Sequence, residues 1–312
     1  MLAGGVAMLW VGGEAFVRGG VGVARVMKLS PLLIGMTLIG FGTSLPELVT
    51  SLSAALEGHP GLAVGNVVGS NIANILLILG AGAALATIPV KPDAFRSNAV
   101  ALSAATIVSA WLIRGGTIDR VGGAALLLAL ALYIGFAYVR ERNGARSGGG
   151  SGEAGAIGPY PRSLALGLAM AGAGIVLVAA GGYVFVQGAI GLAGWLGVPG
   201  SLVGLTVVAV GTSLPELAVT VVASLRRQSD VALGNIVGSC LFNLLGILGA
   251  TALAEPIRVP PSLQGADLLV MVAATGLMML FAGTGLRISR WEGWTMLVLY
   301  VAYIAWHGVT RA

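Results

Sequence analysis

Two glutamates with matching neighbours are the residues best suited to chemistry. Glu47 and Glu216 each lie inside a long apolar segment, at the end of the motif Gly-Thr-Ser-Leu-Pro-Glu. An ionisable group at membrane depth is costly and is by default a sign of function. The alternative, a protonated glutamate bonded to a backbone carbonyl for structure alone, does not account for two copies with identical polar neighbours. We therefore expect both carboxylates to bind the same kind of ligand.

Hydroxyl groups accompany each carboxylate at helical spacing. Thr43 and Ser44 precede Glu47 by four and three residues, so the three side chains crowd one side of a helix. The second copy repeats this arrangement with Thr212 and Ser213. The motif therefore supplies carboxylate and hydroxyl oxygens at one level of the membrane.

The proline of the motif predicts a broken helix. Pro46 has no N–H to offer the carbonyl of Gly42, and its ring disturbs that turn. A free carbonyl is costly against lipid, but it becomes a ligand oxygen where it lines a cavity. Gly40 lets the backbone open and lets an ion approach. Pro215 and Gly211 are the corresponding residues of the second copy.

The next apolar segment in each half carries a polar stripe along one helix face. Its members are an asparagine, a serine and a second asparagine at four-residue spacing, namely Asn66, Ser70 and Asn74, and Asn235, Ser239 and Asn243. A single asparagine in such a helix is more often an interhelical hydrogen-bond partner, and we assign that role to Asn66 and Asn235. The matched positions of the other four residues favour a lining for the same site.

The oxygens of these motifs suit hard cations. Ca²⁺ takes about 6–8 carboxylate, hydroxyl, amide or carbonyl oxygens in flexible geometry. A softer transition metal recruits His or Cys, but His59 and His307 fall near predicted helix ends, and Cys240, the only cysteine, is interpreted as a small buried thiol. Two glutamates balance one Ca²⁺, and several Na⁺ ions fit the same oxygens, which suggests exchange by competition for one site.

The composition is that of a membrane protein. Of 312 residues, 57% are hydrophobic and only 9% are charged, about a third of the charged share usual in soluble domains. A soluble domain, a disordered chain and a nucleic-acid binder are therefore excluded, despite the net charge of +5. An intramembrane enzyme with Ser44 or Ser213 as nucleophile lacks a nearby base. A passive channel needs a continuous pore, whereas broken helices favour a closed site.

Ten apolar segments are candidates to cross the bilayer. The first is interpreted as a membrane helix and not as a signal peptide, because it has no positively charged start. Residues 140–162 are rich in Gly, Ser and charge, which predicts a flexible linker. The predicted spans are 2–26, 31–57, 62–86, 97–113, 121–139, 163–196, 201–225, 231–253, 267–283 and 291–308.

An internal repeat relates the two halves of the chain. Shifted by 169 residues, 35–81 aligns with 204–250 without a gap, with 23 of 47 positions identical. Five spans in each half place the second half in the membrane with opposite topology, as in many secondary transporters. We predict an all-α polytopic membrane protein with ten transmembrane helices as two inverted five-helix repeats, 1–139 and 163–312. Broken helices 2, 3, 7 and 8 are expected to surround a midplane ion site.

The basic residues predict the orientation. With the N-terminus outside, twelve Lys and Arg residues fall in inside loops and four in outside segments. Cytoplasmic loops carry the excess of positive charge. We therefore expect a cytoplasmic linker and both termini outside.

The motifs resemble those of the cation/Ca²⁺ antiporter superfamily. The two glutamate motifs, each followed by a Gly-Asn…Gly-Ser…Asn pattern, look like its alpha-1 and alpha-2 motifs at 35–81 and 204–250. The short linker is similar to that of prokaryotic sodium/calcium exchangers. The resemblance implies an antiporter, not an enzyme, that extrudes Ca²⁺ from a prokaryotic cell in exchange for Na⁺ by alternating access. We expect an inner-membrane monomer with no cofactor and no nucleic-acid partner.

The resemblance also implies a ligand set for the transported ions. It adds the backbone carbonyls of Gly40 and Ala209 to the side chains already singled out. The implied ligands are Glu47, Glu216, Thr43, Ser44, Thr212, Ser213, Ser70, Asn74, Ser239, Asn243, Gly40 and Ala209.

Alternatives stay open within the superfamily. Ca²⁺/H⁺ exchange is one, since a carboxylate can carry a proton, although proton-coupled members carry Gly-Asn-x-x-Glu where this chain has the proline motif. Potassium-dependent members carry Asp at the position of Asn74 or Asn243, so these asparagines argue against K⁺ co-transport. Glu14, whose repeat partner is Tyr183, is expected to pair with Arg18 and not to bind ions.

Overall fold

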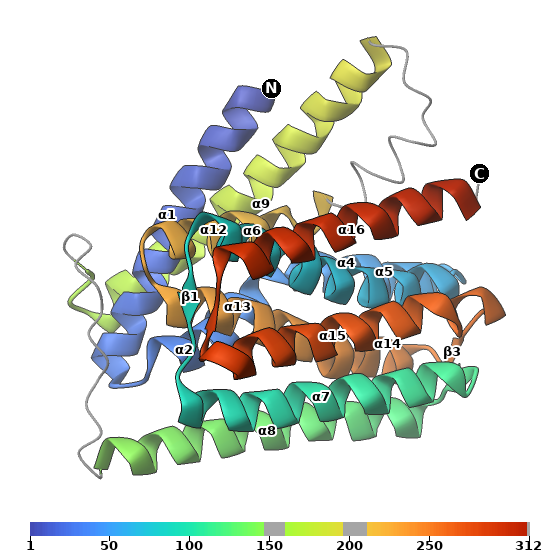
Figure 1. Cartoon of the computed structure of the whole chain (residues 1–312), viewed down its shortest axis with the longest axis horizontal. Coiled ribbons are helices and arrows are strands. Elements are labelled where there is room, and N and C mark those ends of the chain that lie inside the picture. Colours follow the sequence, from blue (N-terminus) through green and yellow to red (C-terminus); the bar gives the residue numbers. More distant parts are fainter. Residues whose placement is uncertain (147–159, 196–210, 311–312) are drawn as a thin grey trace.

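The computed structural model describes residues 1–146, 160–195 and 211–310. Long helices lie alongside one another, and α1 and α9 run side by side across one end of the bundle (Figure 1). Elements of the first half are α1 (Leu2–Met27), α2 (Pro31–Ile34), η1 (Gly35–Ile39), α3 (Gly40–Thr43), α4 (Leu45–Leu56), α5 (Pro60–Ile72), η2 (Ala73–Leu79), α6 (Gly80–Leu85), β1 (Ile88–Pro89), α7 (Pro92–Arg114), β2 (Thr117–Ile118) and α8 (Arg120–Arg146).

The second half repeats this order. Its described elements are α9 (Leu164–Trp195), α12 (Leu214–Leu225), α13 (Ser229–Leu241), η4 (Phe242–Ile247), α14 (Leu248–Ala254), β3 (Ile257–Arg258), η5 (Pro261–Leu263), α15 (Ala266–Gly285), β4 (Arg287–Ile288) and α16 (Arg290–Thr310). The predicted span 201–225 is described from 211 onward. α8 continues through Arg146, so the first residues of the predicted linker are helical. Arg and Glu in this stretch are good helix formers beyond the apolar part of the helix.

The helices match a membrane protein in length and composition. In the described part of the chain, seven helices are long and apolar enough to span a bilayer, and the bent pair 31–43 and 45–56 is an eighth candidate. α12 is a shorter apolar helix. The start of the second span is as predicted, because the Ser30 hydroxyl accepts a hydrogen bond from the Leu33 N–H and Pro31 follows it.

The two helices that carry the polar stripes form the centre of the molecule. In the helix that runs through α5, η2 and α6, 72% of the most apolar stretch is buried, and in the helix through α13, η4 and α14 the share is 83%. Around them pack α7, α8, α15 and α16, which expose more of their surface. The centre therefore holds the polar residues away from lipid.

Two short strand ladders close the bundle at its opposite ends. β1 pairs antiparallel with β4, and β2 pairs antiparallel with β3. Each ladder joins one half of the chain to the other, and β1 and β3 are related by the 169-residue shift, whereas β2 and β4 lie 170 residues apart. Strands of two residues carry no periodic signal, so the sequence did not predict them.

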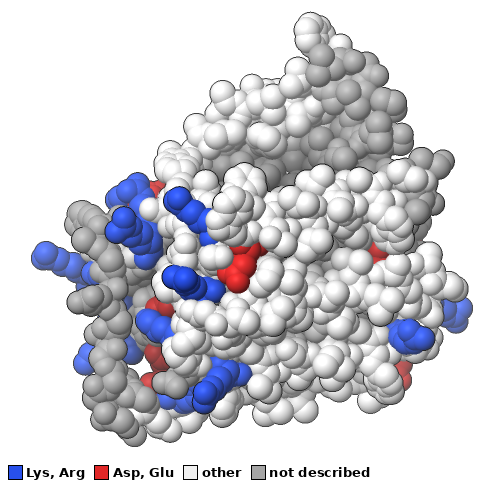
Figure 2. Space-filling model, viewed as in Figure 1, with Lys and Arg blue, Asp and Glu red and all other residues white. Residues whose placement is uncertain are grey.

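Lys and Arg gather at one end of the molecule. Figure 2 shows most of the visible basic side chains over the end where α8 ends and α9 begins, and few at the opposite end. Below, the first of these ends is called the linker side and the second the far side.

Candidate cation site

Both glutamates lie in the first turn of a helix that starts directly after a non-helical serine. Ser44 separates α3 from α4 with a non-helical backbone, and the two helical parts are bent by 46°. Glu47 follows in the first turn of α4. Ser213 has nearly the same backbone angles, and Glu216 lies in the first turn of α12. The predicted break is therefore present beside Glu47, and a non-helical serine likewise precedes the helix of Glu216.

The two carboxylates are tied to each other's motif. The Ser44 hydroxyl donates to Glu216 Oε1 at 2.8 Å, and the Ser213 hydroxyl donates to Glu47 Oε1 at 3.1 Å. Glu47 is 1% exposed and Glu216 is fully buried. The spacing predicted that each serine crowds the glutamate of its own motif, whereas its hydrogen bond crosses to the other repeat. The crossing brings both glutamates to one place.

A carbonyl of the broken helix collects hydroxyl groups. Gly40 O accepts hydrogen bonds from Thr43 Oγ1 at 3.2 Å and from Ser239 Oγ at 3.1 Å. The Thr43 hydroxyl also lies 3.2 Å from Asn235 Oδ1 and 3.4 Å from Ser239 Oγ. The site therefore joins the glutamate motif of one repeat to the polar stripe of the other.

Glycine makes this contact between the repeats possible. A Cβ atom on Gly238 would lie 2.1 Å from the Met36 carbonyl oxygen, and one on Gly40 would lie 2.9 Å from the Ser239 nitrogen. The backbones of η1, α3 and α13 thus touch directly, as small residues allow between membrane helices. Larger side chains here would push Thr43 away from Ser239.

Asn66 and Asn235 tie the stripe helices to the glutamate helices, as predicted. Asn66 Nδ2 donates to the Glu47 carbonyl at 3.2 Å and to the Ser51 hydroxyl at 2.9 Å. Asn235 Nδ2 donates to the Glu216 carbonyl at 3.3 Å and to Thr220 Oγ1 at 2.9 Å. Each amide therefore fixes the backbone of a glutamate.

Replacing Asn235 by alanine is expected to destabilise the protein by about 1–3 kcal/mol, because buried partners lose their donor. Asn66→Ala should cost less, since Asn66 is only half-buried whereas Asn235 is fully buried. Thermal unfolding in detergent measures both changes. Equal melting temperatures for wild type and Asn235→Ala would contradict this role.

Six buried polar atoms of the site lack a hydrogen-bond partner in the described part of the chain. They are Glu47 Oε2, Glu216 Oε2 and both amide atoms of Asn74 and Asn243. The two asparagines lie on the π-helical segments η2 and η4, a feature frequent at functional sites. η2 packs against α12 and η4 against α4, so each asparagine lies on a helix that meets the glutamate helix of the other repeat. Buried oxygens without partners fit a cation that they would coordinate.

The remaining predicted ligands are placed less directly. Ser70 is buried on α5 one turn before Asn74, and Thr212 is half-buried just before α12. Ala209 lies outside the described residues. Within the described residues, no group of three or more His, Cys, Asp and Glu side chains lies close enough to hold a metal ion.

Glu14 has two basic partners. Arg18 Nε donates to Glu14 Oε1 at 2.6 Å, as predicted, and Arg226 Nε donates to Glu14 Oε2 at 2.9 Å. The second partner comes from the end of α12 and was not predicted, because nothing in the sequence brings these helices together. The ion pair connects α1 to the helix that carries Glu216.

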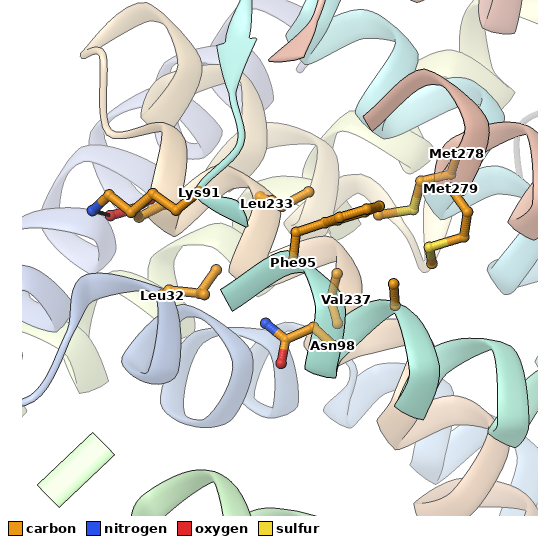
Figure 3. Close-up of a pocket in the computed structure, with 10 residues that line it drawn as sticks. Leu32, Lys91, Phe95, Asn98, Leu233, Val237, Met278 and Met279 are labelled. Atoms are coloured by element: carbon orange, nitrogen blue, oxygen red, sulfur yellow. Dashed lines mark hydrogen bonds and ion pairs between the residues drawn. The ribbon is translucent and has the colours of Figure 1, made fainter. Parts of the chain in front are cut away.

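A pocket on the linker side is separate from the glutamates. Figure 3 shows Phe95 lying across it, with Lys91 at one end and Met278 and Met279 at the other. Lys91 Nζ forms an ion pair with Asp230 at 2.6 Å on its rim. None of the predicted ligands lines this pocket. It is a mainly apolar crevice and no part of the cation site.

The fold and the site define a class of protein, a membrane transporter of cations. The family model described as sodium/calcium exchanger protein matches residues 1–139 and 166–308. The chain belongs to this family and is thus a cation/Ca²⁺ exchanger of the membrane, a transporter and not an enzyme.

Relatives span nearly the same length. The sodium/calcium exchanger MaX1 of Methanosarcina acetivorans is 32% identical over 333 residues, which cover 96% of this chain and 95% of MaX1. The inner membrane protein YrbG of Escherichia coli is 34% identical over 252 residues, 80% of this chain and 78% of YrbG. The structure of the sodium-calcium exchanger NCX_Mj soaked with 10 mM Na⁺ and zero Ca²⁺ is 31% identical, with a TM-score of 0.82 over 97% of this chain and 96% of that chain.

Proposed function

We propose that this protein exchanges Na⁺ for Ca²⁺ by alternating access at one site around Glu47 and Glu216. The pair of buried carboxylates, cross-linked by the serines of the opposite repeat, is the observation that carries the proposal. Two carboxylates balance one Ca²⁺, and the neighbouring hydroxyl and amide oxygens suit either ion. NCX_Mj structures soaked with Na⁺, Ca²⁺ or Sr²⁺ are consistent with this choice of substrates.

In this proposal the predicted ligands come from two sets of helices around the glutamates. Thr43, Ser44, Thr212, Ser213 and the carbonyls of Gly40 and Ala209 supply oxygens from the broken helices. Ser70, Asn74, Ser239 and Asn243 supply them from the stripe helices. This division rests on the repeat and on the burial of the described members, all of which are buried except Thr212, which is half-buried.

The switch between the two sides is assigned to α1 and α9 moving as one unit. Their backbones lie in contact, since a Cβ on Gly174 would lie 2.5 Å from the Phe16 nitrogen and one on Gly19 would lie 2.5 Å from the Ala171 nitrogen. Two other glycines of α1, Gly13 and Gly20, lie against Val222 of α12 and Ile39 of η1, so small residues also line the surface over which the pair would slide. In this proposal ten spans form two inverted five-helix repeats, and the linker side, with its excess of Lys and Arg, is cytoplasmic. Ca²⁺ then leaves a prokaryotic cell through its inner membrane as Na⁺ enters, and one chain suffices.

Ion gradients imposed in turn test the coupling. The protein in proteoliposomes is expected to take up radiolabelled Ca²⁺ when the vesicles are loaded with Na⁺ and diluted into Na⁺-free buffer. Uptake without a gradient of Na⁺ should be at background, and adding K⁺ should not raise it, because Asn74 and Asn243 provide no third carboxylate.

Three results would distinguish the alternatives. Uptake driven by a pH gradient with Na⁺ absent identifies a Ca²⁺/H⁺ exchanger and overturns the proposal. Uptake that requires K⁺ overturns the K⁺-independent form. Flux that needs no counter-ion and does not saturate identifies a channel.

A further inference from the structure

Two buried hydroxyl groups outside the cation site lack a hydrogen-bond partner. Among the described residues, eight buried side-chain atoms are unpartnered, and six of these belong to the cation site. The other two are Ser224 Oγ and Thr251 Oγ1, whose residues are 2% and 1% exposed. A buried polar atom without a partner is unfavourable and requires an explanation. Their places in the repeat supply one.

Ser224 ends a buried polar track that starts at Glu216. Glu216, Thr220 and Ser224 are spaced by four residues along α12, so they share one face of the helix. All three are buried, and Asn235 holds the Thr220 hydroxyl from one side. α12 ends at Leu225 on the linker side. The track therefore runs from the carboxylate to the linker end of the helix.

α6 covers this track with a glycine. A Cβ on Gly82 would lie 2.8 Å from Ser224 Oγ and 3.0 Å from Thr220 Cγ2. No side chain of α6 thus separates the hydroxyls from the helix that covers them. In this structure the track is closed where its hydroxyls lie against the α6 backbone at Gly82.

Thr251 occupies the equivalent interface on the far side. It is the repeat partner of Gly82 and lies on α14, which packs against α4. On α4, Ser51 follows Glu47 by four residues, and Ala55 takes the place of Ser224. Each interface thus contains one unpartnered hydroxyl, which comes from the glutamate helix on the linker side and from the stripe helix on the far side. Ser224 lies opposite Gly82, and the repeat relates Thr251 and Ala55 to the same pair of positions.

We propose that these hydroxyls are secondary cation positions on the routes between the central site and the two membrane surfaces. Ser224, with Thr220, serves the linker side, and Thr251, with Ser51, serves the far side. A hydroxyl is a hard oxygen ligand without charge, so it replaces one water of a passing Ca²⁺ or Na⁺ and releases the ion again. This inference rests on the proposed exchange at Glu47 and Glu216.

Ser224→Ala and Thr251→Val test the inference through Ca²⁺/Ca²⁺ self-exchange in proteoliposomes, a reaction that needs no coupling ion. The maximal rate is expected to fall about five-fold in each variant, because one oxygen ligand is lost on each route. The melting temperature should stay equal or rise, since an unpartnered hydroxyl disappears. In vesicles of one orientation, Ser224→Ala should raise the half-saturating Ca²⁺ concentration on the linker side only.

Two control variants separate transport from packing. Ser53→Ala removes an exposed hydroxyl on α4 and should change neither rate nor stability. Ser109→Ala removes a buried hydroxyl that donates to the Leu244 carbonyl at 3.3 Å, so it should lower the melting temperature. Unchanged self-exchange in both test variants, or a loss of rate matched by a loss of stability as in Ser109→Ala, overturns the inference. If the wild type shows Ca²⁺/Ca²⁺ self-exchange but no Na⁺-driven uptake, the proposed Na⁺ coupling is wrong and the inference about Ser224 and Thr251 is still tested by self-exchange.

Discussion

Replacing Glu47 or Glu216 by glutamine is expected to abolish Na⁺-driven Ca²⁺ uptake in proteoliposomes. Both carboxylates are buried, so each loss leaves a dehydrated dication with half of its counter-charge. Removing one partner from a buried ionic group costs about 3–5 kcal/mol, which corresponds to a loss of affinity on the order of 100-fold or more. Glutamine keeps the size of the side chain, so the change isolates the charge.

The repeat supplies the internal comparison for this experiment. Because the serines cross, Glu47→Gln and Glu216→Gln change the same shared site and should fail to the same extent. Glu57→Gln removes an exposed carboxylate at the end of α4 and should leave transport unchanged. Retained Na⁺-driven uptake in either buried variant would show that the glutamates are structural.

The sequence singles out Glu47 and Glu216 because charge is so rare in it. Two of twelve acidic residues lie deep in apolar segments with the same neighbours, which made Glu47 and Glu216 stand out without a structure. The roles of Asn66 and Asn235 followed from the known preference of lone membrane asparagines for interhelical bonds. Local sequence patterns of this kind are enough to predict candidate functional residues where these are polar residues inside apolar segments.

Other features depended on how distant segments meet. The serine spacing pointed to the glutamate of the same motif, whereas each serine hydroxyl donates to the glutamate of the other repeat. The π-helical segments around Asn74 and Asn243 have no apolar period that differs from that of an α-helix over so few residues. The Glu14–Arg226 pair likewise requires the packing of α1 on α12. Such contacts follow from tertiary structure alone.

Among the glycines that the structure describes, Gly238 is expected to be the one where an added methyl group is most damaging. Its Cβ would lie 2.1 Å from the Met36 carbonyl oxygen and 2.6 Å from the Met36 carbonyl carbon, and backbone atoms cannot move aside as a flexible side chain does. Overpacking of a tight interior costs about 1–3 kcal/mol and sometimes more. The displacement falls on the contact that joins Gly40, Thr43 and Ser239, so Ca²⁺ transport should fall at least about ten-fold together with the melting temperature.

Gly276→Ala provides the matched control. Gly276 lies on an exposed face in the interior of α15, and a Cβ there would meet nothing within 4 Å. Alanine is a better helix former than glycine by about 1 kcal/mol, so this variant should be as stable as the wild type or more so and should transport normally. If Gly238→Ala behaves like Gly276→Ala, the two repeats are not in backbone contact at the cation site. If it fails while Gly276→Ala does not, the site depends on how closely one repeat's broken helix approaches the other repeat's polar stripe, because no ligand has been changed.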